Sequence, residues 1–223
     1  MIFARKSKIF EQIFSLYNRN LFQRRFHRFS VAGLENLVSR NKQIPLILYA
    51  NHSSWWDGLV AFEIGRKARL DHFVLMEEKQ LKNLFLFKYL GAFSVVRETP
   101  REAVRSINYA VDLLKEKENR ALWIFPQGEI LPNDIRPLRF FNGIGRIIEK
   151  LENCYVAPVA MRYEHLGNFK PEVLARIGRP EEFGTVLDRK FLTEQLSEEL
   201  TNLLEQVKTN IVENEINDYK TIF

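Results

Sequence analysis

Several features that define other classes of protein are missing from this chain. A single cysteine, Cys154, among 223 residues excludes a disulfide framework and favours a reducing compartment. No apolar run approaches the ~20 residues needed to cross a bilayer. The start of the chain lacks the long apolar core of a secretory signal peptide, so none is expected. We therefore expect one domain with one sizeable core.

Common catalytic and cofactor-binding signatures are also absent. There is no G-x-S-x-G nucleophile elbow, and nothing around Cys154 resembles a catalytic cysteine site, so no covalent intermediate is expected. His27, His72 and His165 have no partners at metal-ligand spacing, and we expect them to be structural. The chain has no Walker loop. The sequence therefore predicts no metal and no cofactor.

Positive charge is concentrated near the N-terminus. Residues 1–30 carry seven basic residues and one acidic residue, a net charge of +6, whereas the remaining 193 residues have a net charge of −1. Aromatic residues recur in this segment at helical spacing, at Phe10, Phe14 and Tyr17 and again at Phe22, Phe26 and Phe29. The pattern predicts a basic amphipathic helical segment.

Two interpretations of this segment are open. An ordinary helix would pack its aromatic side chains on the core. The interpretation we adopt is that residues 1–30 form a membrane-interfacial segment, separate from an α/β domain over residues 31–223. Removing residues 1–28 should then leave the α/β core folded. The predicted membrane contacts are Phe10, Phe14, Phe22, Phe26, Arg24, Arg25, Trp55 and Trp56. A nucleic-acid partner is not expected, because the rest of the chain is not basic.

Short apolar strands alternate with helical patterns over the rest of the chain. The predicted strands are 46–48, 72–76, 91–96, 121–125 and 155–160, with 174–177 as an edge strand. The predicted helices are 56–66, 79–89, one beginning after Thr99, 143–151 and a long helix through 192–211. This alternation predicts an α/β fold with a largely parallel sheet flanked by helices on both faces.

The segment PLILYANHSSWWDG, residues 45–58, joins the first of these strands to a histidine and an aspartate. In a turn that opens a helix, Asp57 can reach back to one ring nitrogen of His52, like the base and its orienting carboxylate in a catalytic triad. The alternative is that both residues only cap the strand and the helix. Trp55 and Trp56, which lie between them, either contact lipid or brace the turn.

Three further segments follow in order: GAFSVVR at 91–97, FPQGE at 125–129 and VAPVA at 156–160. Together with NHSSWWD, which matches an N-H-x4-D block, they resemble the four sequence blocks of the glycerolipid acyltransferases, the family that acylates lysophosphatidic acid and related lipids. The resemblance covers roughly residues 31–159. It implies an O-acyltransferase of phospholipid biosynthesis with an α/β fold. The donor would be acyl-CoA or an acyl-carrier protein, and the acceptor a lyso-glycerolipid.

Because the chain lacks a nucleophile elbow and a catalytic cysteine site, we expect direct transfer. His52, oriented by Asp57, would deprotonate the acceptor hydroxyl, which attacks the thioester carbonyl. Histidine suits this role because its charge changes in the neutral pH range. Backbone N–H groups near Gly128 are our candidates for the oxyanion site, since glycine permits close approach. The enzyme is expected to act as a peripheral protein at the cytoplasmic face of a membrane.

The chain departs from the family in the block that contacts the acceptor. The family sequence F-P-E-G followed by Thr and Arg is here FPQG followed by Glu129 and Ile130, so an arginine that helps to hold a phosphate is missing. The predicted substrate-binding residues are Arg97, Pro126, Gln127, Gly128, Glu129, Arg136 and Arg139. The resemblance makes Arg97 a phosphate contact, whereas the alternative is a solvated arginine at a strand end.

Two alternatives for the acceptor follow from this departure. Arg136 or Arg139 completes a phosphate site in place of the missing arginine. Otherwise the acceptor has no phosphate, and Gln127 and Glu129 bind the hydroxyls of an uncharged lipid or glycolipid alcohol. A third possibility is a peripheral membrane module that binds lipid through a decayed catalytic site.

Overall fold

The computed structural model describes residues 1–96, 99–186 and 188–223. The strands in this part of the chain are β1 (Arg28–Ala32), β2 (Leu46–Ala50), β3 (Asp71–Glu77), β4 (Ala92–Val95), β5 (Arg120–Ile124), β6 (Cys154–Glu164), β7 (Glu172–Ile177), β8 (Glu181–Phe183) and β9 (Lys220–Thr221). The helices are α1 (Lys8–Arg25), α2 (Leu34–Val38), α3 (Asp57–Lys67), α4 (Glu78–Asn83), the 3-10 helix η1 (Phe85–Leu90), α5 (Pro100–Lys115), α6 (Gly143–Leu151) and α7 (Arg189–Val212).

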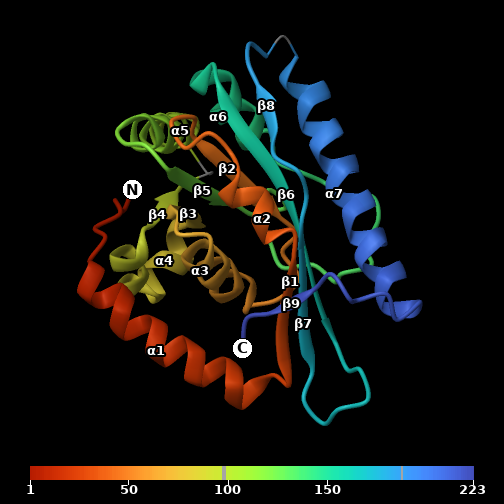
Figure 1. Cartoon of the computed structure of the whole chain (residues 1–223). Helices are drawn as coiled ribbons and strands as arrows, with labels where there is room; N and C mark the ends of the chain where they lie inside the picture. The colour runs from red at the N-terminus through yellow and green to blue at the C-terminus, as the bar shows by residue number, and fades with distance from the viewer. Residues whose placement is uncertain (97–98, 187) are drawn as a thin grey trace.

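The described strands form one sheet in the order β4-β3-β5-β2-β6-β7-β1-β9, and β8 pairs with β6 (Figure 1). The block from β4 to β6 is parallel throughout, and β1 is also parallel to β7. The contacts of β6 with β7 and β8, and of β1 with β9, are antiparallel. The predicted α/β class with a largely parallel sheet is confirmed. Because parallel strands end at one edge, the loops after β2 and β5 lie together there.

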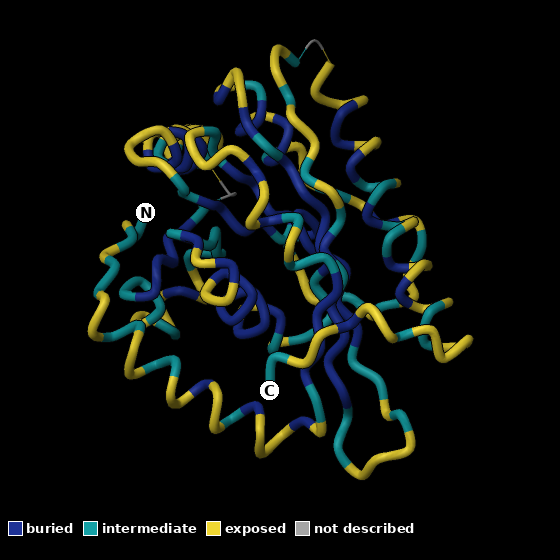
Figure 2. The backbone as a smooth tube through the Cα atoms, in the orientation of Figure 1, coloured by how far each residue is buried: buried dark blue, intermediate teal, exposed yellow. Residues whose placement is uncertain are grey.

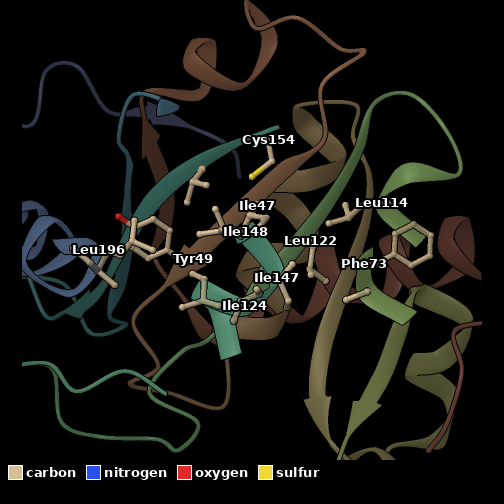
Figure 3. Packing of buried hydrophobic residues seen from close by; sticks show 14 of the residues in the cluster. Ile47, Tyr49, Phe73, Leu114, Leu122, Ile124, Ile147, Ile148, Cys154 and Leu196 are labelled. Atoms are coloured by element: carbon tan, nitrogen blue, oxygen red, sulfur yellow. The ribbon is translucent and has the colours of Figure 1, made fainter. Parts of the chain in front are cut away.

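The alternation of side chains along β2 shows how the sheet is covered on both faces. Ile47 and Tyr49 join a core formed with α5, α6 and α7, and Figure 3 shows them beside Ile148 and Leu196. Leu46, Leu48 and Ala50, which point to the opposite face, join a second core with α1 and α3. The strands are therefore buried on both faces, and the tube in Figure 2 is dark blue through its centre.

The N-terminal segment differs from the prediction. The helix α1 ends at Arg25, and the chain passes directly into β1, whose Phe29 pairs in register with Val173 of β7. The predicted boundary between residues 30 and 31 therefore falls inside a strand, and the first segment is part of the domain. For the same reason 174–177 is no edge strand, because β1 pairs with β7 on the side away from β6.

The aromatic residues at the end of α1 are core residues. Phe22 and Phe26 are only 1% and 6% exposed, and their rings stack at 5.3 Å. The predictions that these two side chains contact a membrane are wrong. One turn before Phe22, on the same face of α1, the buried Asn18 donates a hydrogen bond of 2.8 Å to Glu63 of α3. Removal of residues 1–28 would uncover this core, which contradicts the expectation that the domain folds without them.

A second apolar stripe lies on the outer face of α1. Ile9, Ile13, Leu16 and Tyr17 follow helical spacing and are between 60% and 72% exposed. Lys8 and Arg19 are exposed beside the stripe, and Arg24 and Arg25 are exposed at the end of the helix. In the described part of the chain, no helix combines the length and the apolar character needed to span a bilayer.

Candidate active site

The carboxyl end of β2 and the start of α3 bring His52 and Asp57 together. His52 Nδ1 lies 2.8 Å from Asp57 Oδ2. The same carboxylate oxygen accepts hydrogen bonds from the backbone amides of Ser53 and Ser54, at 2.7 and 2.8 Å. Asp57 is the first residue of α3 and is fully buried, so these bonds fix its position. With Nδ1 turned to Asp57, Nε2 is the ring nitrogen left for a substrate.

Tyr163 of β6 completes the hydrogen bonding of this carboxylate. Its hydroxyl donates to Asp57 Oδ1 at 2.5 Å. Burial, together with the negative charge of Asp57, raises the pKa of Tyr163 well above its usual range, so the phenol keeps its proton and remains a donor. The sequence analysis missed Tyr163, and no local signal could have found it, because 106 residues separate it from Asp57.

The FPQGE segment holds the backbone of His52. The amide of His52 donates to Gln127 Oε1 at 2.7 Å, and its carbonyl accepts from the amide of Leu131 at 2.9 Å. The ring of Phe125 lies 4.8 Å from the imidazole ring. Gln127 is buried, and its amide oxygen is engaged with the histidine, whereas we had predicted a contact with the acceptor. Gln127 thus holds the backbone of His52.

Gly128 forms the turn of this segment. Its φ of +72° is in the left-handed region that favours glycine, and its N–H donates to the carbonyl of Phe125 at 3.0 Å. This amide therefore closes the turn. That contact removes the Gly128 N–H itself from our candidates for the oxyanion site.

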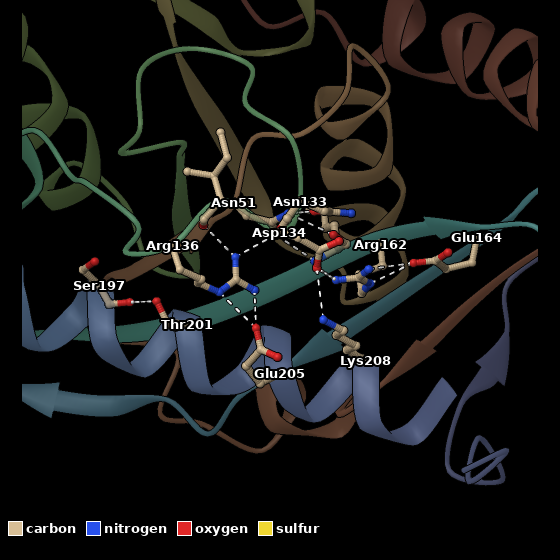
Figure 4. A network of polar contacts seen from close by, with 12 residues as sticks. Asn51, Asn133, Asp134, Arg136, Arg162, Glu164, Ser197, Thr201, Glu205 and Lys208 are labelled. Atoms are coloured by element: carbon tan, nitrogen blue, oxygen red, sulfur yellow. Dashed lines mark hydrogen bonds and ion pairs between the residues drawn. The ribbon is translucent and has the colours of Figure 1, made fainter. Parts of the chain in front are cut away.

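Asn51, which precedes the histidine, ties the end of β2 to β6. Its side chain donates to the carbonyl of Met161 at 2.9 Å and accepts from the amide of Met161 at 2.8 Å. It also donates to Asn133 Oδ1 at 3.0 Å, and Figure 4 shows Asn51 and Asn133 side by side. Since Met161 lies two residues before Tyr163, this contact sets the register between His52 and the strand that supports Asp57.

His52 lies on the wall of a cavity of about 740 Å³. This volume is in the range of small-molecule sites. Most of the lining side chains are apolar and come from both sides of the sheet edge, from α3, α4 and η1 on one side and from α5 and α6 on the other. Pro126 and Gly128, two of the residues predicted to bind substrate, contribute to the wall, and Phe14 of α1 also lines it. An extended apolar group therefore fits beside the histidine.

The two tryptophans of the motif have different surroundings. Trp56 packs edge-to-face on Phe26 at 4.8 Å and on Phe22 at 5.6 Å, so it braces the turn and is not the membrane contact we predicted. Trp55 lines the cavity and is 54% exposed. Only Trp55 is therefore placed to meet a lipid.

Arg136 and Arg139, two of the three basic residues predicted for the acceptor, are not brought to the cavity. Arg97 lies outside the described residues. Arg136 makes an ion pair of 2.7 Å with Glu205 of α7 and donates to two backbone carbonyls of its own loop (Figure 4). Arg139 and Glu129 are exposed, and neither they nor Arg136 are among the described residues that line the cavity.

Arg146 of α6 is a basic residue that the sequence analysis did not identify. It lines the cavity one turn into the helix, close to the helix start at Gly143, and it forms no ion pair with a described residue. Asn142 and Gly143 line the cavity beside it. A guanidinium at a helix N-terminus is a favourable setting for an anionic group.

Cys154 is unsuited to nucleophilic chemistry. The thiol is free and buried, and burial raises its pKa to about 12. Nucleophilic cysteines need the thiolate. Within residues 1–96, 99–186 and 188–223, no three His, Cys, Asp or Glu side chains are grouped as ligands of a metal ion.

Known proteins resemble this chain in sequence and in fold. A family model described as Acyltransferase matches residues 28–162, which include His52, Asp57 and the FPQGE segment. No curated protein matches the chain. The structure of the 1-acyl-sn-glycerophosphate (LPA) acyltransferase PlsC from Thermotoga maritima is similar with a TM-score of 0.65 and 19% identity, over 90% of this chain and 79% of that one. The pilus retraction motor PilT with bound ADP reaches a TM-score of only 0.34 at 12% identity, over 78% of this chain and 56% of that one.

Proposed function

The chain belongs to the acyltransferase family, and on that premise we propose that it moves a fatty acyl group from a thioester to a hydroxyl of a lyso-glycerolipid such as lysophosphatidic acid. The observation that carries the proposal is the hydrogen-bonded pair of His52 and Asp57 on the wall of a large apolar cavity. A base beside an apolar cavity suits a reaction between a hydroxyl and an acyl chain.

The proposed reaction proceeds by direct transfer. Nε2 of His52 takes the proton of the acceptor hydroxyl as its oxygen attacks the thioester carbonyl. The tetrahedral intermediate then collapses, the C–S bond breaks, and the thiolate takes the proton from the imidazolium. Asp57 keeps the ring in the tautomer with its hydrogen on Nδ1 and stabilises the imidazolium. The buried thiol of Cys154 offers no competing nucleophile.

The apolar cavity supports binding of the acyl chain. Burial of apolar surface contributes about 25 cal/mol per Å², so a long acyl chain gains binding free energy along the whole cavity. The carrier of the thioester in this proposal is coenzyme A or an acyl-carrier protein, and the reaction needs no other cofactor.

Arg146 supports a phosphorylated acceptor. Its position at the cavity wall near the start of α6 allows a guanidinium and backbone amides to face one phosphate. Arg97, predicted from the sequence to contact the phosphate, remains part of this proposal. Arg146 then takes the role of the arginine that Ile130 replaces.

An uncharged acceptor is the second candidate. The observation that favours it is the loss of the expected basic contacts: position 130 is isoleucine, and Arg136 is paired with Glu205. A monoacylglycerol or a glycolipid alcohol would then use the same base and the same cavity.

We propose that the outer face of α1 holds the protein on an anionic membrane as a peripheral protein at its cytoplasmic face. Ile9, Ile13, Leu16 and Tyr17 form the apolar stripe, and exposed basic residues flank it. Phe85 and Leu86 of η1 are also exposed, and η1 packs against α1. These side chains replace Phe22, Phe26 and Trp56 in the predicted membrane contact.

One assay tests the proposed function. The purified chain is incubated with radiolabelled palmitoyl-CoA or palmitoyl-acyl-carrier protein and, separately, with lysophosphatidic acid and monoacylglycerol, beside the variant His52→Ala. We expect labelled diacyl product from the native chain and almost none from the variant. Lipid binding without product, for every donor and acceptor, would instead indicate a lipid-binding module.

A further inference from the structure

Two residues that line the cavity each carry a buried side-chain nitrogen atom without a hydrogen-bond partner among the described residues. The two atoms are Nε2 of His72 and Nε1 of Trp123. The exposed fractions of these residues are 4% and 0%. Leaving a buried polar group unpaired costs free energy comparable to a lost hydrogen bond, so this pair is suited to a polar group inside an otherwise apolar cavity.

The surroundings of His72 define what its free nitrogen can do. Nδ1 lies 3.3 Å from the carbonyl of Leu70, which can only accept, so the hydrogen of the neutral ring is on Nδ1. Burial lowers the pKa of His72 to about 4, which keeps the ring neutral. The Nδ1 edge of the ring packs against Gly65 of α3, where an added Cβ would lie 2.4 Å from Nδ1. Nε2 therefore presents a lone pair, a hydrogen-bond acceptor.

Trp123 supplies the complementary group. An indole N–H can only donate. Because Trp123 pairs in register with Val74, and Val74 lies two residues from His72 on β3, the side chains of Trp123 and His72 are diagonal neighbours on the same face of the sheet. This face of the sheet therefore carries one acceptor and one donor on neighbouring strands.

The strand register gives their depth below the base. In the register between β5 and β2, Trp123 pairs with Leu48. His72 pairs with Ala121 of β5, which in turn pairs with Leu46 of β2. At about 3.3 Å per residue, the pair lies roughly 7 to 13 Å below the end of β2 at Ala50, beyond which His52 follows. A chain that enters beside His52 reaches the pair along its length, away from its thioester end.

We propose that this part of the cavity recognises a hydroxyl group in the middle of an acyl chain, which donates to His72 Nε2 and accepts from Trp123 Nε1. The inference rests on the proposed function and adds a substrate class to it, the mid-chain hydroxyacyl thioesters. A hydroxyl is both a donor and an acceptor, so one oxygen satisfies both nitrogens. A carbonyl or an ether only accepts, and would leave His72 unpaired. A water molecule has the same capability and is the rival occupant.

Binding measured by NMR separates these occupants. The chain contains three tryptophans, so the ¹H–¹⁵N spectrum shows three indole signals, and the variant Trp123→Phe identifies the one of interest. The ligands are palmitic acid, palmitic acid hydroxylated next to the carboxyl group, and mid-chain hydroxypalmitic acids. We expect one mid-chain hydroxy acid to shift the Trp123 indole signal and to bind roughly tenfold more tightly than palmitic acid, from two added hydrogen bonds. The signals of Trp55 and Trp56 are the internal reference.

The variant provides the matched control. Trp123→Phe keeps an aromatic ring in the core but removes the donor, so the preference for the hydroxylated chain should fall to about threefold or less. Equal affinity of the native chain for all the acids, with the same Trp123 signal, would overturn the inference and indicate a resident water molecule. This comparison uses the native chain alone, so it stands even if the variant does not fold.

The transfer assay keeps this inference distinct from the proposed function. Transfer of palmitate with no preference for a hydroxylated chain contradicts only the hydroxyl site. A preference in binding, combined with no transfer from any thioester, contradicts only the proposed reaction.

Discussion

The hydroxyl of Tyr163 donates to the carboxylate oxygen of Asp57 that His52 does not contact. The carboxylate is thus held on both oxygens, from the loop between β2 and α3 and from β6. Its orientation is set before any substrate arrives, which is the preorganisation that the proposed reaction requires of His52.

The first prediction concerns this contact. Tyr163→Phe should lower kcat about tenfold, the low end for loss of a hydrogen bond to a charged group, and should leave KM nearly unchanged. The pH profile of kcat/KM should also move, because the carboxylate that steadies the imidazolium is altered. Tyr155→Phe on the same strand is the control. A lower Tm with an unmoved pH profile would reduce Tyr163 to a structural role.

Substitution of His52, the proposed base, or of its partner Asp57 should reduce activity more than substitution of Tyr163. His52→Ala should lower kcat by at least ~10²-fold, the low end for loss of a general base. Asp57→Asn should also be severe, because the amide has no charge to stabilise an imidazolium and its NH2 group replaces one of the two oxygens, Oδ2 or Oδ1, that accept hydrogen bonds. Single-turnover rates measure both effects, with His27→Ala on the surface as the control. Full activity in either variant would exclude the proposed mechanism.

The two faces of α1 should respond differently to substitution. Phe22→Ala should lower the free energy of unfolding by about 3–5 kcal/mol, because it empties a buried site. Ile13→Glu on the outer face should change stability little but weaken binding to anionic vesicles. Gln12→Glu adds the same charge beside the stripe and is the control. Urea unfolding and vesicle sedimentation give the two readouts, and unchanged sedimentation of Ile13→Glu would contradict the membrane contact.

Acid should destabilise the protein partly through His72. Its pKa is lowered from 6.5 to about 4, chiefly by burial and also by the positive charges of Lys6 and Arg66, while the hydrogen bond to Leu70 and the charge of Asp71 act in the opposite direction. Below pH 6.5 the His72 side chain binds a proton in the unfolded chain but not in the folded chain. The free energy of unfolding therefore falls as the pH drops from 6.5 to about 4. The loss approaches roughly 3 kcal/mol. Urea midpoints should fall less steeply with acid in His72→Gln, and parallel curves would contradict this assignment.

The acceptor is tested through Arg146. Arg146→Ala should raise KM for lysophosphatidic acid about ten- to hundred-fold and leave KM for monoacylglycerol unchanged, since only the phosphate loses a charge-assisted hydrogen bond. Lys150→Ala, an exposed position on the same helix, is the control. Equal effects on the KM of both acceptors would mean that Arg146 does not contact the phosphate. That result would favour the uncharged alcohol as the natural substrate.

Elements with a strong local pattern were predictable from the sequence. Helix α6 has the predicted bounds, because four of its apolar residues repeat at helical spacing and Gly143 begins it. The helix after Thr99 begins at Pro100 as predicted. The pairing of His52 with Asp57 was also predictable, because a separation of five residues is local.

Features that depend on distant partners were not predictable. Strand β1 reads as more helix, because Phe22, Phe26 and Phe29 keep helical spacing, and its partner β7 lies about 140 residues away. The inner and outer faces of α1 are both apolar, so only packing against α3 decides which is buried. Tyr163 and Arg146 are isolated residues in the sequence, and the fold alone brings them to the site.

Helix α1 is shared between the outside of the protein and its cavity, since Ile13 faces outward while its neighbour Phe14 forms part of the cavity wall. A helix with its side chains is about 10 Å across. If the outer stripe rests on a bilayer, a lipid tail has only that thickness of protein between the hydrocarbon phase and the interior of the enzyme. The lipid tail then moves from the apolar interior of the bilayer to the apolar cavity past a single helix. Delivery of the tail by this route avoids the free-energy penalty of exposing it to water.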